Sequence, residues 1–187
     1  MVDMVDTEKE LRSNLKDLLY SEEFSDIQFE VQSRVLKAHR NILTSRSEHF
    51  KTLLSELRPD RLTRPIHIEN ISFDGFKALL HYLYTSEIDE NTKLEIVGEL
   101  IRVSDWYNLE DLKGIGNTFL QANLGVENVI GLFVCATTIE PILEDIENMC
   151  LRFIAKNFQS LYIRPEFKQL SQNLLVKITQ FYGQFQK

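Results

Sequence analysis

The sequence predicts an α+β fold, in which helices flank a small three-stranded sheet, followed by an extension that is helical throughout. Three observations carry this prediction. Two short segments between residues 24 and 39 and a third at 65–71 read as strands. Most of the remaining sequence up to residue 122 has the apolar spacing of helices. From residue 126 onward every segment has helical spacing, so we divide the chain into domains at 1–122 and 123–187.

The composition is that of a globular protein. Of the 187 residues, 43% are hydrophobic and 26% are charged, and this argues against disorder. A net charge of −7 disfavours a phosphate backbone as partner, and Asp60 interrupts the one basic cluster, Arg58, Arg61 and Arg64. No apolar run approaches the roughly 20 residues of a membrane span. The acidic N-terminus is unlike a targeting peptide. We expect a cytoplasmic or nuclear protein that binds neither nucleic acid nor membrane.

The first predicted element is an amphipathic helix over residues 6–19. Thr7–Glu10 has the form of a capping box, in which a hydroxyl and a carboxylate satisfy each other's backbone donors. Four leucines follow at helical spacing: Leu11, Leu15, Leu18 and Leu19. A lone helix of this length is marginal in water. Its leucine stripe must therefore dock, either on its own chain or on a second copy.

A hairpin and a third strand follow. The segment "FSDIQFEV" alternates polar and apolar residues, "SRVLKAH" reads as a second strand, and Gln32–Ser33 is a plausible tight turn between them. Pro65 introduces the third strand, "PIHIENI". The alternation predicts that one face of the sheet is buried.

Helices account for the rest. Two short ones are predicted in "HRNILTS" and "SEHFKTLLSEL", and Ser72 can cap a longer one that carries Phe73, Phe76 and Leu80. Asn91 and Asn108 are expected to open two more. In the extension, Pro141 and Pro165 are placed where helices would begin, which suits their fixed φ.

The junction at His39–Arg40 raises the question of chemistry. No second His, Cys or carboxylate lies at metal-ligand spacing from His39, so we interpret it as a hydrogen-bonded structural residue. Asp26 lies in an apolar strand and needs a partner, because an unpaired buried carboxylate is strongly disfavoured. Arg40 is the simplest candidate.

The amino-acid sequences of these segments resemble those of the BTB/POZ family. "FSDIQFEV", "VLKAHRNILTSRSEHFKTLL" and "IHIENISFDGFKALLHYLYTSEI" are similar to the family's "SD(I/V)" strand, its "AH+xxL(A/T)xxSxxF" segment and its "(F/L)xxLLxYxYT" helix. The match covers residues 20 to about 122. The helices at 126–161 look like the 3-box that follows such domains in cullin-binding adaptors, and residues 165–178 resemble part of a BACK domain.

The resemblance implies a homodimer, in which the N-terminal helix packs across a twofold partner. It assigns the interface to Leu11, Leu15, Leu18, Leu19, Phe24 and Ile27. It also brings Asp26 and Arg40 together in a charged pocket near the dimer seam. Eight leucines across a pair would contribute on the order of 12–24 kcal/mol gross, against an association cost of about 4–15 kcal/mol.

The resemblance further implies a surface for cullin-3, normally a hydrophobic-x-Glu motif. Leu54-Ser55-Glu56 has these letters but comes early, while the family's position falls on Arg58-Pro59-Asp60, where arginine replaces the hydrophobic residue. The candidate contacts are Leu54, Glu56, Arg58, Asp60 and Tyr84.

No pattern of an enzyme is present. The sequence has no GxSxG, P-loop or HExxH motif, and Cys135 and Cys150 are expected to be reduced, buried thiols. We expect no cofactor and no metal.

The predicted function is a homodimeric adaptor that links a substrate, bound outside this chain, to a cullin-3 ubiquitin ligase. The alternative is a dimeric scaffold, such as one recruiting a corepressor, without ligase binding. A tetramerisation module of the potassium-channel type shares the fold but normally lacks the N-terminal helix and 3-box.

Overall fold

The computed structural model describes residues 4–57 and 64–185, which form two compact units. Unit 1 contains the chain up to Thr92 together with Glu99–Gly116, and unit 2 contains Lys93–Gly98 and the chain from Asn117 onward. This division falls within two helices, α5 (Leu94–Ser104) and α6 (Glu110–Asn123). It does not test the expected domain boundary at 122/123, which remains a prediction.

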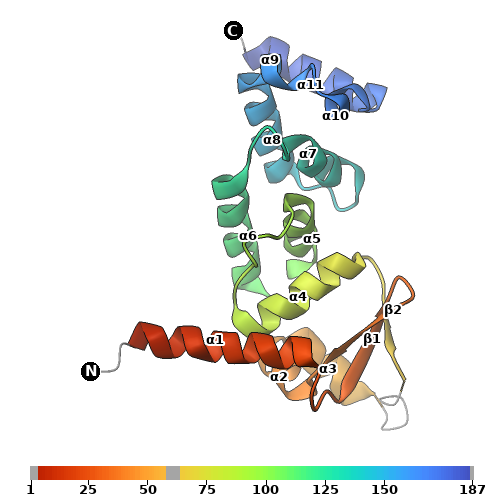
Figure 1. Ribbon diagram of the computed structural model, residues 1–187. Coiled ribbons are helices and arrows are strands. Elements are labelled where there is room, and N and C mark those ends of the chain that lie inside the picture. Colours follow the sequence, from red (N-terminus) through yellow and green to blue (C-terminus); the bar gives the residue numbers. More distant parts are fainter. Residues whose placement is uncertain (1–3, 58–63, 186–187) are drawn as a thin grey trace. The chain divides into compact units, whose positions relative to one another are not determined.

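Unit 1 is built from a small sheet and the helices around it (Figure 1). Its elements before α5 are α1 (Met4–Ser21), β1 (Ile27–Val31), β2 (Arg34–Ala38), α2 (Arg40–Arg46), α3 (Glu48–Glu56), β3 (Ile66–Ile68) and α4 (Phe73–Thr85). The strand order is β2-β1-β3, with β1 antiparallel to β2 and parallel to β3. The predicted three-stranded α+β fold is confirmed.

The hairpin turn lies where the sequence predicts it. Val31 pairs with Arg34, so Gln32 and Ser33 alone connect the two strands. Both have positive φ, 49° and 61°. This is the arrangement of a type I′ turn, whose twist matches that of the flanking strands.

The predicted start of the first helix is wrong. The helix α1 begins at Met4, so Thr7 lies inside it and cannot serve as its N-cap. Ser72, in contrast, caps α4 as expected, because its hydroxyl accepts a hydrogen bond from the Gly75 N–H at 3.0 Å.

Aromatic side chains lie at the centre of the core of unit 1. The rings of Phe29 (β1), Phe50 (α3) and Phe76 (α4) are fully buried and meet edge to face, with centroids 5.1–6.5 Å apart. Tyr107 stacks on Phe50 at 5.2 Å. Such pairs add to the stability gained from area burial alone. This core fixes α3 and α4 against the sheet.

Unit 2 is helical among its described residues. It contains α7 (Val129–Thr138), α8 (Glu144–Lys156), α9 (Phe158–Leu161), α10 (Pro165–Lys168) and α11 (Gln172–Phe185). Pro165 begins α10 as predicted, whereas α8 begins three residues after Pro141. Cys135 and Cys150 are both buried, and burial raises the pKa of Cys150 to about 12. Across residues 4–57 and 64–185, we find no helix with the length and apolar character needed to cross a membrane.

Candidate functional site

His39 occupies a closed polar network at the entrance to α2. It is buried; its Nδ1 lies 2.7 Å from the Tyr84 hydroxyl, and its Nε2 lies 2.6 Å from the carbonyl oxygen of Glu23. The backbone N–H of His39 donates to the same Tyr84 oxygen at 2.8 Å. His39 thus connects α4 to the loop between α1 and β1.

The partners of His39 define its tautomer. A carbonyl oxygen can only accept, so Nε2 carries the proton that is donated to Glu23. In a neutral ring Nδ1 is then an acceptor, and the Tyr84 hydroxyl donates to it. Burial raises the pKa of Tyr84 to about 12, although the hydrogen bond from the His39 backbone opposes this, so the hydroxyl keeps its proton. Every polar atom of the His39 ring has a partner, which fits a structural role.

The structure brings Asp26 and Arg40 together. Arg40 Nε lies 2.9 Å from Asp26 Oδ2, and the Arg40 backbone N–H donates to Asp26 Oδ1 at 2.8 Å. The second contact caps the first turn of α2, because Arg40 is the first residue of that helix. The expectation that Asp26 is buried is wrong, since both side chains are nearly half exposed.

The balance of forces on Asp26 favours its charged form. Partial burial acts to raise the pKa of this carboxyl, but the hydrogen bonds and the charge of Arg40 together outweigh it and hold the pKa below its usual value. Asp26 is therefore ionised at neutral pH and remains paired.

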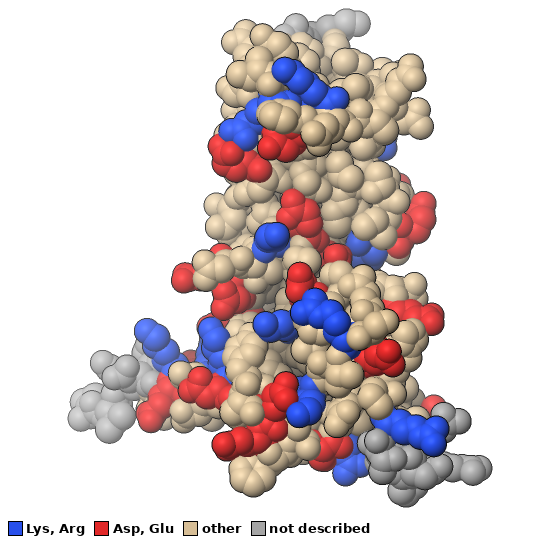
Figure 2. Space-filling model, turned by 45° about the vertical axis from the view of Figure 1, so that its right-hand side comes forward, with Lys and Arg blue, Asp and Glu red and all other residues tan. Residues whose placement is uncertain are grey.

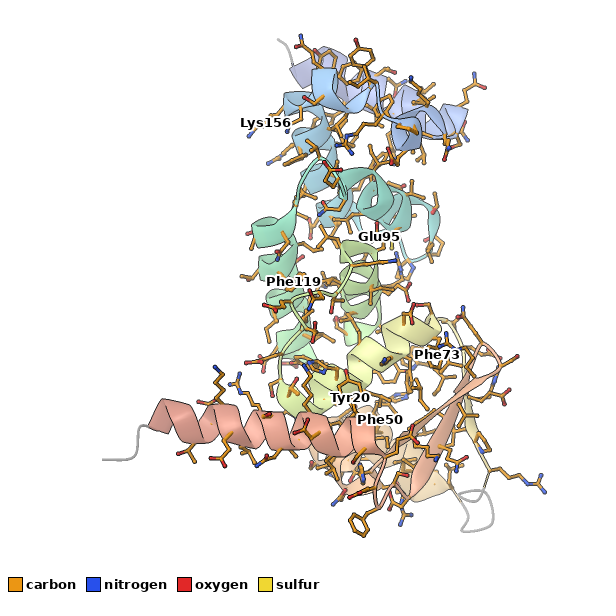
Figure 3. All side chains as sticks on the ribbon, viewed as in Figure 1. Tyr20, Phe50, Phe73, Glu95, Phe119 and Lys156 are labelled. Atoms are coloured by element: carbon orange, nitrogen blue, oxygen red, sulfur yellow. The ribbon has the colours of Figure 1, made fainter. Side chains whose placement is uncertain are left out.

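Helix α1 docks on α4 through an apolar and a charged contact. Leu19 is buried, and Leu15 packs against the core cluster of unit 1. Figure 3 labels Tyr20 at the end of α1 that meets α4, and its hydroxyl lies 3.3 Å from His81 Nδ1. Two ion pairs join α1 to the segment after α4, Arg12 with Glu87 and Lys16 with Asp89. All four of these residues line an open groove of about 800 Å³.

The expected dimer residues divide into two groups. Leu11 is 58% exposed and Phe24 is 89% exposed, while Leu18 is half-buried. Ile27 is only 1% exposed, because it lies on the inward face of β1. Within its own chain Ile27 therefore exposes almost no surface, and its assignment to the dimer interface stays a prediction. Leu19 is likewise a residue of its own chain's core.

The expected cullin contacts are divided in the same way. Leu54 is 7% exposed and Tyr84 is 3% exposed, so neither presents a surface to a partner. Both side chains fill the core of unit 1, and their assignment as cullin-3 contacts stays a prediction. Glu56, at the end of α3, is exposed. Arg58 and Asp60 lie outside the described residues.

Charges of both signs are mixed on the face of the molecule that Figure 2 shows. Figure 2 shows acidic and basic side chains interspersed rather than gathered into a basic stripe.

A second groove, of about 610 Å³, lies in unit 2 between α6 and α8, with Leu124, Met149 and Phe153 beside Arg152 and Lys156. In the part of the chain that the structure describes, no three His, Cys, Asp or Glu side chains are placed to hold a metal ion.

The comparisons identify what the chain is similar to. A sequence model of the BTB/POZ domain matches residues 15–124. BTB/POZ domain-containing protein 9 of Drosophila melanogaster is 28% identical over 181 residues, covering 94% of this chain and 24% of that protein. The human protein of the same name is 27% identical over 170 residues, covering 90% and 28%. Kelch-like protein 40 of Xenopus tropicalis is 25% identical over 171 residues, covering 90% and 27%.

Among solved structures, the BTB domain of zebrafish PATZ1 is similar, with a TM-score of 0.51 and 21% sequence identity. That likeness covers 66% of this chain and 98% of the PATZ1 domain, and it shows the fold alone. The chain spans about a quarter of the length of the three relatives above. Their alignments run past residue 124, so the similarity includes the helical extension as well as the BTB domain.

Proposed function

Because the chain belongs to the BTB/POZ family, we propose that it acts as a homodimeric adaptor joining a target protein to a cullin-3 ubiquitin ligase. Family membership and the similarity to BTB-containing relatives support the general role of a protein-interaction adaptor. The adaptor would act in the cytoplasm or nucleus and catalyse no reaction itself. By holding the target close, it would raise the effective concentration of target at the ligase.

The observation that carries the homodimer is the exposure of apolar side chains within α1 and shortly after it. Leu11 and Phe24 are both more than half exposed, although water disfavours such side chains. Both lie in or next to α1, whose amino-terminal half extends away from the sheet (Figure 1). A second copy would cover them with the same surface of its own, as a twofold interface requires.

The energy available to the dimer is smaller than a four-leucine stripe suggests. Leu15 and Leu19 already pack on their own chain, so Leu11, Leu18 and Phe24 remain. Six such side chains in a pair contribute at most about 9–18 kcal/mol gross, since Leu18 is already half-buried. This overlaps an association cost of about 4–15 kcal/mol. The proposed dimer therefore depends strongly on each of the three.

The link to cullin-3 rests on family and on the helical extension. The similarity to the relatives continues through unit 2, where we propose that the helices following α6 act as the 3-box and part of a BACK domain. The target would bind outside this chain. Within α3, Glu56 remains as an exposed candidate contact.

The second candidate is a dimeric scaffold that binds no ligase. The burial of Leu54 and Tyr84 favours it, because two of the five candidate contacts then lie in the core of their own chain.

Light scattering after size-exclusion chromatography, on this chain mixed with the N-terminal domain of cullin-3, tests both candidates. A complex of two chains with two cullin domains supports the adaptor. A bare dimer that elutes apart from the cullin domain favours the scaffold, and a monomer contradicts both. Glu56→Lys is expected to weaken the complex, whereas Glu48→Lys, at another exposed residue of the same helix, serves as its control.

A further inference from the structure

The loop between α1 and β1 holds a large aromatic side chain in an unusual backbone conformation. Phe24 has φ of 59° and Glu22 has φ of 57°, both in the left-handed region. Bulky residues adopt this region rarely, and such strain persists only where surrounding contacts impose it. Phe24 gains no burial in return, since 89% of it is exposed.

Several contacts fix this loop from both sides. The Ser25 N–H donates to the Glu22 carbonyl at 3.3 Å, and the Asp26 N–H donates to the Ala38 carbonyl at 3.1 Å. Glu22 also pairs with Lys37 at 3.0 Å. These contacts close the loop onto the end of β2.

A contact from the buried side chain of His39 also reaches the loop. Its Nε2–H donates at 2.6 Å to the carbonyl of Glu23, the residue directly before Phe24. The ring can donate there because Tyr84 occupies its other nitrogen and fixes the tautomer. A chain of hydrogen bonds therefore runs from α4 through His39 to the backbone next to Phe24.

We infer that His39 and Tyr84 are positioning residues for self-association, which hold the loop so that Phe24 is presented as an anchor to a second copy of the chain. This inference rests on the proposed dimer. A side chain that is ordered before binding loses less freedom on association, so a preformed loop strengthens binding without adding a contact. An aromatic side chain can bury about 150–250 Å² of its surface at such a contact.

A second copy is the occupant that fits the position of Phe24. The loop directly continues α1, which carries Leu11 and Leu18, the other exposed or half-exposed apolar residues of the proposed seam. In a twofold dimer each copy supplies one such loop, so any change in its geometry acts twice.

A double-mutant cycle on the dimer dissociation constant tests the inference. Tyr84→Phe removes both hydrogen bonds that hold His39 and is expected to weaken the dimer by roughly three- to tenfold. In a Phe24→Ala background, the same change should have little further effect, because the side chain that the loop presents is absent. Equal weakening in both backgrounds, or none, would overturn the inference. Tyr82→Phe, an equally buried change in α4, is the control.

Two glycine variants separate presentation from strain. Asn70→Gly and Phe24→Gly both relieve a left-handed backbone, so neither should lower the unfolding temperature greatly. Asn70 is exposed and lies outside the loop between α1 and β1. Only Phe24→Gly should weaken the dimer, by tenfold or more. Equal dimer constants for the two variants would contradict the anchor.

Amide hydrogen exchange at Ser25 and Asp26 reports on the loop without reference to the dimer. Tyr84→Phe should accelerate exchange at these two positions more than in β1, and unchanged exchange would overturn the role of His39 and Tyr84. If the wild-type chain is monomeric at every concentration, the proposed dimer and the anchor fail, while accelerated exchange would still establish that the two residues hold the loop.

Discussion

The Tyr84 hydroxyl lies 2.7 Å from His39 Nδ1 and 2.8 Å from the His39 backbone nitrogen, so one oxygen on α4 serves two polar groups at the start of α2. The two residues are 45 positions apart in the sequence. Their contact explains why a histidine can lie in the core between two apolar segments. Each of its ring nitrogens has a protein partner, and neither is left for a metal or a substrate.

Removing this oxygen should destabilise the protein. Tyr84→Phe leaves the His39 N–H and Nδ1 without a partner in a buried position, and we expect a loss of about 1–3 kcal/mol in the free energy of unfolding. Urea denaturation measures it. Tyr82→Phe removes a hydroxyl from the same helix at the same 3% exposure but not from this network, and should lose less. Equal losses would show that the two hydrogen bonds add nothing specific.

The stability contributed by Asp26 should depend on pH. Its pKa is lower in the folded chain than the usual 3.8, so its contribution is present above that value and is lost as the pH falls through the folded pKa. Because the ion pair is nearly half exposed, Asp26→Asn should cost less than about 1 kcal/mol at neutral pH. The difference from wild type should shrink below about pH 4. Denaturation curves at neutral and acid pH measure both, and a difference that grows on acidification would contradict the pairing.

A companion variant separates the charge of Asp26 from its capping role. Asn retains an oxygen that can accept from the Arg40 N–H, whereas Asp26→Ala removes it. The alanine variant should therefore lose about 0.5–2 kcal/mol, the range for a helix cap. Arg40→Gln should resemble Asp26→Asn, because it leaves the backbone contact in place.

Local chemistry predicted the parts of the fold that depend on neighbouring residues. The Gln32–Ser33 turn and the Ser72 cap follow from short segments, and the structure has both. The parallel pairing of β3 with β1 joins residues far apart in sequence, and no local pattern specifies it. The same holds for the contact of His39 with Tyr84, two residues that the sequence highlights separately.

The burial of two site residues could have been predicted. Leu54 lies four positions after Phe50, which places both on one face of α3. Tyr84 lies in "FKALLHYLYT", a stretch that is apolar on nearly all sides and therefore typical of a buried helix. The exposure of Leu11 was not predictable, because the leucine stripe alone does not tell how far α4 extends along α1.

The proposed seam should be sensitive to charge on one side of α1. A double variant, Leu11→Asp with Leu18→Asp, would bring four carboxylates together across a twofold axis, and we expect a monomer at concentrations where the wild type is dimeric. Ser13→Asp places a carboxylate at an exposed position on another side of the helix and should leave the dimer intact. Light scattering measures both. A doubly substituted chain that stays dimeric would exclude this seam.

Substitution of Leu54 should mainly lower stability, whereas substitution of Glu56 should mainly weaken the binding of cullin-3. Leu54→Ala opens a cavity in the core of unit 1 and should lower the free energy of unfolding by about 2–5 kcal/mol. Glu56→Ala changes an exposed side chain and should alter it by less than about 0.5 kcal/mol. If Leu54→Ala binds less cullin-3, the loss should be proportional to the fraction of unfolded chain. If Glu56→Ala binds less cullin-3 while it stays folded, the loss reflects a missing contact. Denaturation and binding measured on the same samples separate the two effects. A Leu54→Ala chain that is stable but fails to bind would indicate that Leu54 contacts cullin-3 directly.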